Sequence, residues 1–213
     1  MNTLPLSLTI ACLALTAALI LAIHRGSALA TAVFKSGASV AFLATAWSLG
    51  ALASPMGRLM LLALGLSVVG DLCLLSRQSR WFLAGLGVFL LAHLAFAAAF
   101  ATGAWSVAGA GAGAAFMLVV GLVSLRWLWP YLHGVMRPAV VAYIVAIGAM
   151  GALAIGHSAA SGHGLIAIGA MLFAASDLSV ARQAFIAPSL INQAWGLPAY
   201  YVAQLLLAWS VPR

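Results

Sequence analysis

The sequence predicts an all-α integral membrane protein that crosses the bilayer about eight times. Of its 213 residues, 66% are hydrophobic and only 5% are charged, whereas a soluble domain carries about 25% charged residues. A chain in hydrocarbon must satisfy its own backbone hydrogen bonds, so only helices or a closed barrel can span a bilayer. Apolar runs of about 20 residues, the length that crosses the hydrocarbon core, select helices.

Each expected helix is an apolar run bounded by polar or turn-forming residues. His24-Arg25-Gly26-Ser27 follows the first run, and Thr102-Gly103, which carries no charge, is the weakest of the breaks. The eight predicted spans are 4–23, 33–53, 58–75, 80–101, 104–125, 138–156, 163–181 and 194–211. Because no segment between them is long enough to fold by itself, residues 1–213 are expected to form a single transmembrane helical domain.

The basic residues predict the orientation of the chain. Nine Lys and Arg and two acids give a formal net charge of +7, but the basic residues are scattered singly, unlike the clustered patch of a nucleic-acid-binding protein. Nucleic acid is therefore not an expected partner. Short cytoplasmic loops are enriched in Lys and Arg, so the side with more of them is expected to be cytoplasmic and both termini to be non-cytoplasmic. One side holds Arg25, Lys35, Arg77, Arg80, Arg126, Arg137 and Arg182, and the other holds Arg58 and Arg213.

An internal echo favours two halves of four helices in the same orientation. Asp71-Leu72 in the third span resembles Asp177-Leu178 in the seventh, and each pair is soon followed by an arginine and a glutamine. Lys35-Ser36 opens the second span as Arg137-Pro138 opens the sixth. Parallel repeats of this kind occur in other membrane bundles.

The two acidic residues of the whole chain, Asp71 and Asp177, both fall inside predicted spans. An ionised carboxylate in hydrocarbon costs several kcal/mol unless it is paired, hydrogen-bonded or neutralised. Both aspartates are therefore candidate catalytic residues. The alternative is that each pairs with a neighbouring Lys or Arg and only locks helices together.

The third and seventh spans run in the same direction, which places both acids at the same depth. Asp71 and Asp177 precede arginines by similar distances, so each should lie about 7 to 9 Å below the inner boundary of the membrane. Four other polar side chains are expected near this level: Lys35, Tyr143, Tyr200 and Tyr201. We therefore expect a single polar pocket that opens toward the cytoplasmic leaflet.

His93, in the fourth span, is the one histidine expected well inside the membrane. A lone intramembrane histidine is more often a packing or hydrogen-bonding residue than a catalyst. The other four, assigned to loops or helix ends, are His24, His133, His157 and His163. A zinc site needs three or four converging ligands, and only His93 with the two aspartates could supply them. We expect no metal and no cofactor.

Five motifs in a fixed order cover nearly the whole chain. They are Gly70-Asp71-Leu72-Cys73-Leu74-Leu75; Phe82-x-x-Gly85-x-x-x-Phe89-x-x-x-His93; Pro138 with Tyr143; Gly169-Ala170-Met171-Leu172-Phe173 leading to Ser176-Asp177; and Tyr200-Tyr201-x-Ala203-Gln204. In these motifs the chain resembles the YhhN-type lysoplasmalogenase family of eight-helix membrane hydrolases. It departs from the family at Ser36, where a proline usually follows the lysine, and at Phe96, where a tyrosine is common.

The resemblance implies an ether hydrolase that cleaves the vinyl ether bond of lysoplasmalogens to a fatty aldehyde and glycerophospho-ethanolamine or glycerophospho-choline. Protonation of the vinyl ether β-carbon creates an oxocarbenium ion that water attacks, so one acid and one base are needed. Two carboxylates can divide these roles, as they do in glycosidases; the sequence leaves open which aspartate is the acid. Residues expected to bind or orient the substrate are Lys35, His93, Tyr143, Tyr200, Tyr201 and Gln204, with Lys35 or a loop arginine holding the phosphate.

A proton-coupled transporter is the alternative function, with Asp71 and Asp177 as its relay. Transport needs acids that are accessible from both sides in turn, whereas both are expected near one face. A membrane scaffold ranks third, because it has little reason to keep buried acids. The loop-poor chain suggests a bacterial cytoplasmic (inner) membrane, with the site toward the cytoplasmic leaflet. Its expected partners are a lysophospholipid substrate and membrane lipid, and no obligatory protein partner is expected.

Overall fold

The computed structural model describes residues 3–76 and 78–211, and Arg77 and Arg213 of the orientation argument lie outside them. Over the described residues the chain forms eight α-helices and three short helical turns. They are α1 (Leu4–His24), α2 (Ala28–Ser48), η1 (Ala51–Ala53), α3 (Pro55–Cys73), α4 (Ser79–Ala101), α5 (Val107–Leu128), η2 (Trp129–Tyr131), α6 (Met136–Ser161), α7 (Leu165–Ala181), η3 (Arg182–Ile186, a π-helical turn) and α8 (Leu190–Trp209).

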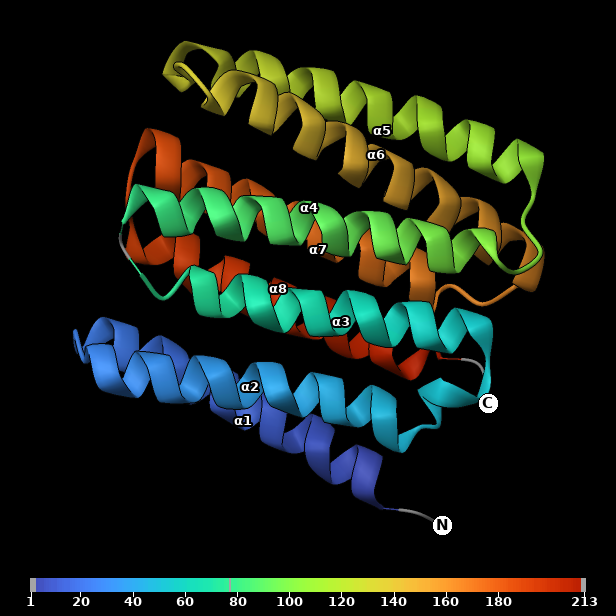
Figure 1. The fold of residues 1–213 in the computed structure, drawn as a ribbon, viewed down its shortest axis with the longest axis horizontal. Helices are drawn as coiled ribbons and strands as arrows, with labels where there is room; N and C mark the ends of the chain where they lie inside the picture. Colours follow the sequence, from blue (N-terminus) through green and yellow to red (C-terminus); the bar gives the residue numbers. More distant parts are fainter. Residues whose placement is uncertain (1–2, 77, 212–213) are drawn as a thin grey trace.

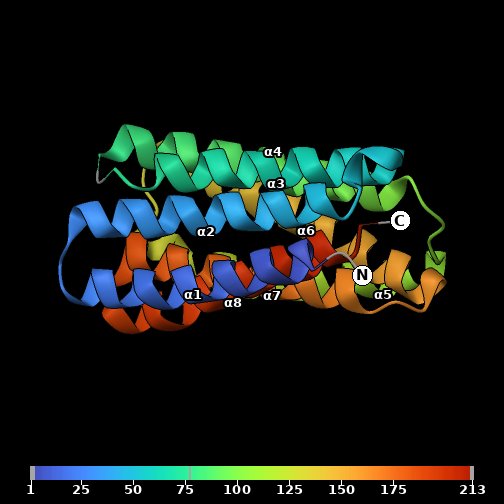
Figure 2. The ribbon, with the colours of Figure 1, turned by 90° about the horizontal axis from the view of Figure 1, so that it is seen from below.

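The eight helices form one elongated bundle of four antiparallel hairpins (Figure 1). The hairpins are α1–α2, α3–α4, α5–α6 and α7–α8, joined through packing of α2 on α3, α4 on α6 and α6 on α7. Both ends of the described chain lie at the same end of the bundle (Figures 1 and 2). Eight consecutive antiparallel helices give this arrangement, and the predicted all-α membrane fold is confirmed.

Seven of the helices, α1 to α7, are long and apolar enough to cross a membrane. Helix α8 is the more polar one, and it packs against α1, α2, α3 and α7. Its buried side chains include Asn192, Tyr200, Tyr201 and Gln204. The neighbouring helices cover these polar groups, so α8 places hydrogen-bonding side chains in the interior of the bundle instead of toward lipid.

The second helix differs most from its predicted range of 33–53. It begins at Ala28 because the Ser27 side chain caps it, accepting a hydrogen bond from Ala30 N at 3.3 Å. It ends at Ser48, before Gly50, whose φ of +86° breaks the helix. Lys35 therefore lies seven residues into α2, about 10 Å from its start, and assigning it to a cytoplasmic loop was wrong.

Two further boundaries change the setting of predicted residues. Helix α6 continues to Ser161 and ends at Gly162, whose φ is +73°. His157 is therefore a helical residue, not a loop residue. Pro198 lies inside α8, which continues through it as one helix.

The packing of α2 in the first four helices is repeated by α6 in the last four. Helix α2 packs on α1, α3 and α8, and α6 packs correspondingly on α5, α7 and α4. The acids occupy matching places, Asp71 near the end of α3 and Asp177 near the end of α7. These contacts fit the two parallel halves that the sequence echo favours.

Candidate active site

Asp71 accepts contacts from three donors in the interior of the bundle. Its Oδ1 atom lies 3.3 Å from Lys35 Nζ, and its Oδ2 atom accepts hydrogen bonds of 2.7 Å from both Ser39 Oγ and Tyr200 OH. The side chains of Lys35 and Asp71 are 12% and 4% exposed. A carboxylate with a cation and two hydroxyl donors is fully paired in its ionised form. Lys35 is thus the ion-pair partner of Asp71.

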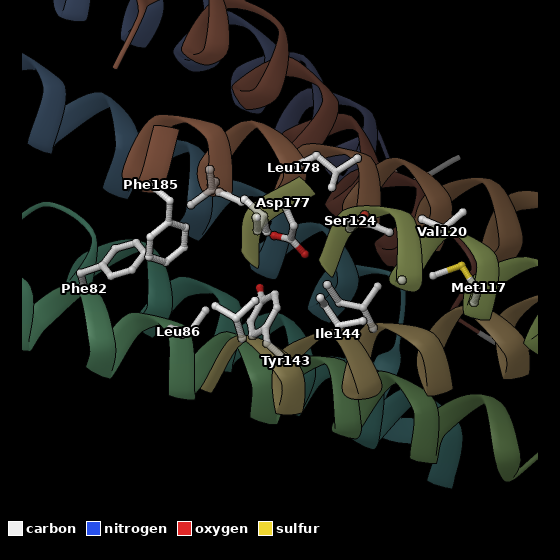
Figure 3. A pocket seen from close by; sticks show the side chains of 17 residues that line it. Phe82, Leu86, Met117, Val120, Ser124, Tyr143, Ile144, Asp177, Leu178 and Phe185 are labelled. Carbon is white, nitrogen blue, oxygen red and sulfur yellow. The ribbon is translucent and has the colours of Figure 1, made fainter. Parts of the chain in front are cut away.

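Asp177 has a different set of neighbours. Its Oδ2 atom lies 3.2 Å from Nε2 of His93, which is completely buried, and the Tyr143 hydroxyl points toward the carboxyl and interacts with it (Figure 3). The His93 to Asp177 approach is not aligned as a hydrogen bond, and neither of these two atoms has another hydrogen-bond partner among the described residues. Asp177 therefore has hydrogen-bonding capacity left for a further molecule.

The tautomer of His93 follows from its other nitrogen. Nδ1 lies 2.6 Å from the backbone oxygen of Phe89, one turn earlier in α4. A carbonyl oxygen can only accept a hydrogen bond, so Nδ1 must carry the proton. In neutral His93 the lone pair is then on Nε2, facing Asp177.

The two acid sites are built in the same way, because each receives one partner from its own half and one from the other half. Asp71 on α3 meets Lys35 from α2 and Tyr200 from α8, and Asp177 on α7 meets Tyr143 from α6 and a histidine from α4. Each acid is thus bound by the second helix of its own half and the fourth helix of the other half. Tyr143 therefore has the position in the second half that Lys35 has in the first. The sequence echo suggested Arg137 as the residue equivalent to Lys35.

Aromatic rings stand between the two sites. The Tyr200 ring contacts Phe89 and Phe173, with centroids 6.0 and 5.5 Å away, and Phe173 contacts the His93 ring at 4.4 Å. The polar side chains expected in a single pocket therefore make two separate sets of polar contacts, one around Asp71 and one around Asp177. Bulky rings from α4, α7 and α8 divide the polar groups into two clusters, which a residue-by-residue estimate of depth does not reveal.

A pocket lined almost entirely by apolar side chains of α4, α5, α6, α7 and η3 opens beside Asp177 (Figure 3). Asp177, Tyr143 and Ser124 are its polar lining residues. Phe82 and Phe185 lie toward one end and Met117 toward the other, with Asp177 and Tyr143 between them (Figure 3). Such a lining suits a hydrocarbon chain, with one carboxyl placed along its course.

The remaining predicted residues lie around Asp71. Tyr201 OH donates to the backbone oxygen of Lys35 at 3.2 Å and lies 3.3 Å from Ser39 Oγ. Gln204 Nε2 donates to Ser67 Oγ at 3.3 Å, one helical turn before Asp71 on α3. Ser39 and Ser67 were not among the site residues predicted from the sequence. A signal was available for Ser39, because it lies four residues after Lys35 and thus on the same helix face.

Among residues 3–76 and 78–211, no three His, Cys, Asp or Glu side chains converge as metal ligands would. His93 and Asp177 are adjacent, whereas Asp71 belongs to the other cluster.

Comparisons with known proteins agree on one family. The sequence model of the YhhN family matches residues 30–211. The chain is 36% identical over 193 residues to a lysoplasmalogenase of Mycobacterium bovis, covering 85% of this chain and 70% of that protein. It is 29% identical over 165 residues to the lysoplasmalogenase TMEM86A of Bos taurus, covering 75% of this chain and 67% of that protein. No solved structure matches the chain significantly. The chain is an integral membrane protein that belongs to the YhhN family.

Proposed function

We propose that this protein is a lysoplasmalogenase, which hydrolyses the vinyl ether bond of a lysophospholipid within the membrane. The family match and the names of the relatives support an ether hydrolase. The observation that carries the chemistry is the Asp177 carboxyl, placed in an apolar pocket 3.2 Å from Nε2 of His93. The transporter alternative receives no support from these relatives.

Asp177 is the proton donor in this proposal. Tyr143 and a neutral His93 supply no cation that would stabilise a carboxylate at this position, and a protonated carboxyl suits an apolar site. The proton moves from Asp177 to the β-carbon of the vinyl ether, which leaves an oxocarbenium ion and an Asp177 carboxylate. A positioned general acid contributes about 10²- to 10⁴-fold to such a step.

The same carboxylate then completes the reaction. Water attacks the carbon next to the ether oxygen and gives up a proton to Asp177, which restores the acid. The resulting hemiacetal collapses to the fatty aldehyde and the glycerol hydroxyl of the head-group fragment. Protons balance over the cycle, with one water consumed. Tyr143, whose hydroxyl points to Asp177 (Figure 3), orients the attacking water.

Asp71 acts in its ionised form. Its three donors hold the negative charge in place, and Tyr200 links it to the aromatic rings that contact His93. Charge interactions reach further in the low dielectric of a membrane interior than in water. We therefore assign Asp71 the stabilisation of the oxocarbenium ion and the positioning of Tyr200.

The location of the reaction is part of the proposal. The described arginines gather at the end of the bundle where α1, α3, α5 and α7 finish, with Arg58 at the opposite end. The positive-inside rule supports a cytoplasmic position for the arginine-rich end, in a bacterial inner membrane. A lysophospholipid of the cytoplasmic leaflet can then reach the pocket from the side.

The test is product analysis in heavy water. Purified protein in detergent is incubated with 1-alkenyl-lysophosphatidylethanolamine in D2O. The aldehyde is trapped at once and its mass is measured by mass spectrometry. Protonation at carbon places one deuterium on the carbon next to the aldehyde group, and the saturated 1-alkyl analogue is not cleaved. Failure of well-folded protein to release aldehyde, or release without deuterium, contradicts the proposal.

A further inference from the structure

A lysophospholipid carries a phosphodiester, which needs a partner at the membrane interface. The sequence offers Lys35 or a loop arginine for this role, and Lys35 is 12% exposed and already paired with Asp71. It stands in the other cluster, away from the lining of the pocket. A phosphate beside the pocket must therefore find a different cation.

Helical geometry shows which of the described arginines at the arginine-rich end of the bundle face the pocket. On α5, Arg126 lies two residues from Ser124 and from Leu128, both of which line the pocket, so it points about 180° away from them. Arg80 lies two residues before Phe82, which lines the pocket from α4, so it points to the other side of that helix, and Arg182 donates to Asn192 on α8. None of these three is aimed at the pocket.

Arg137 is on the pocket face of α6. It lies one turn before Val140 and two turns before Ile144, both of which line the pocket, and it stands in the first turn of the helix, at the arginine-rich end. Its side chain is exposed. Arg137 thus lies just beyond the pocket, on the side where a head group would meet water.

The guanidinium of Arg137 is also held in place. Its Nε donates to the backbone oxygen of Leu132 at 2.9 Å, and its Cζ lies 4.8 Å from the centre of the Trp129 ring. The hydrogen bond uses Nε alone, which leaves the two terminal nitrogens available. A planar guanidinium with two such donors suits a phosphate better than a flexible lysine does.

The spacing from the acid to Arg137 fits the substrate. Tyr143, which points to Asp177, is six residues after Arg137 on α6, a rise of about 9 Å. The β-carbon of a lysoplasmalogen is seven bonds from the phosphorus atom. At the 3.8 Å spanned by three bonds of an extended chain, that is about 9 Å. The phosphate can therefore lie at the level of Arg137 while the β-carbon is level with the acid.

We propose that Arg137, oriented by Leu132 and Trp129, binds the phosphodiester of the lysophospholipid and sets the depth at which the vinyl ether meets Asp177. The inference rests on the proposed function for its substrate class. It adds a specificity residue that selects phospholipids over neutral ether lipids. The alkenyl chain then runs from Asp177 toward Met117, along the apolar lining.

Binding tests this inference separately from hydrolysis. The probes are the uncleavable 1-alkyl-lysophosphatidylethanolamine and 1-alkylglycerol, which share the hydrocarbon chain and differ in the phosphodiester. Wild-type protein in nanodiscs should bind the first more tightly. Arg137→Gln should weaken that binding about 10- to 100-fold, the worth of a charge-assisted hydrogen-bonded contact, and leave 1-alkylglycerol binding unchanged. Arg137→Lys should lie between.

Arg126→Gln is the matched control. It also removes one cation at this end of the bundle, but from the face of α5 that points away from the pocket. Melting temperatures of the variants establish that each is folded. Equal preference for the phospholipid in wild type and a folded Arg137→Gln, or an equal loss in Arg126→Gln, overturns the inference. Aldehyde release by wild type alongside such a result would leave the hydrolase proposal standing.

Discussion

Variants of the Lys35–Asp71 pair can distinguish a catalytic role of Asp71 from a structural one. Asp71→Asn keeps an acceptor for Ser39 and Tyr200 but leaves the Lys35 ammonium unpaired, with a side chain only 12% exposed. Losing one partner of a buried ion pair costs about 3 to 5 kcal/mol. At about 2 to 4 °C per kcal/mol for a chain of this size, the melting temperature should fall by about 6 to 20 °C.

The double variant Lys35→Met/Asp71→Asn removes both charges, so most of this lost stability should return. Activity should not return with it, because the charge that stabilises the oxocarbenium ion is still missing. We expect kcat to remain about 100-fold or more below wild type, the usual cost of removing an electrostatic stabiliser. The assays are thermal unfolding in detergent and aldehyde release under saturating substrate. A double variant that is stable and has wild-type kcat would refute the catalytic role and leave Asp71 as a helix lock.

Three other predictions concern the pocket and the orientation of the chain. Tyr143→Phe keeps the ring but removes the hydroxyl that faces the acid, so kcat should fall by about 10-fold, the worth of one net hydrogen bond, with KM nearly unchanged; a kcat equal to wild type would remove Tyr143 from the reaction. Ser124→Leu fills the pocket and should raise KM, whereas Leu122→Phe, on an exposed position of α5, should not; equal KM values would place the substrate elsewhere. In inside-out vesicles, a membrane-impermeant maleimide should label His133→Cys and spare His163→Cys, and the reverse pattern would invert the proposed orientation.

Composition and apolar run length were enough to predict the eight helices, because backbone hydrogen bonding in a membrane allows few alternatives. The error at the second helix has a local cause. Lys35-Ser36 was predicted to open the span, yet Lys35 lies seven residues inside α2 and pairs with Asp71 in the interior. When a residue far along the chain offsets the free-energy cost of burying a charge, the local sequence gives no sign of it.

The sequence singled out several side chains of the two clusters but not how they are arranged. The rarity of acids in a membrane span singled out Asp71 and Asp177, and motif order added His93, Tyr143 and Tyr200. Their division into two clusters depends on ring contacts between helices from different halves of the chain. The orientation of the His93 ring depends on a single contact with a backbone oxygen, for which the sequence carries no signal.

The most direct test of the central claim is the activity of Asp177→Asn on 1-alkenyl-lysophosphatidylethanolamine, measured as aldehyde release beside wild type. The amide keeps the size and shape of the side chain but cannot donate a proton to carbon. Wild type should release aldehyde, and the variant, with an unchanged melting temperature, should be slower by about 10²- to 10⁴-fold. Aldehyde release by Asp177→Asn at the wild-type rate would contradict the account.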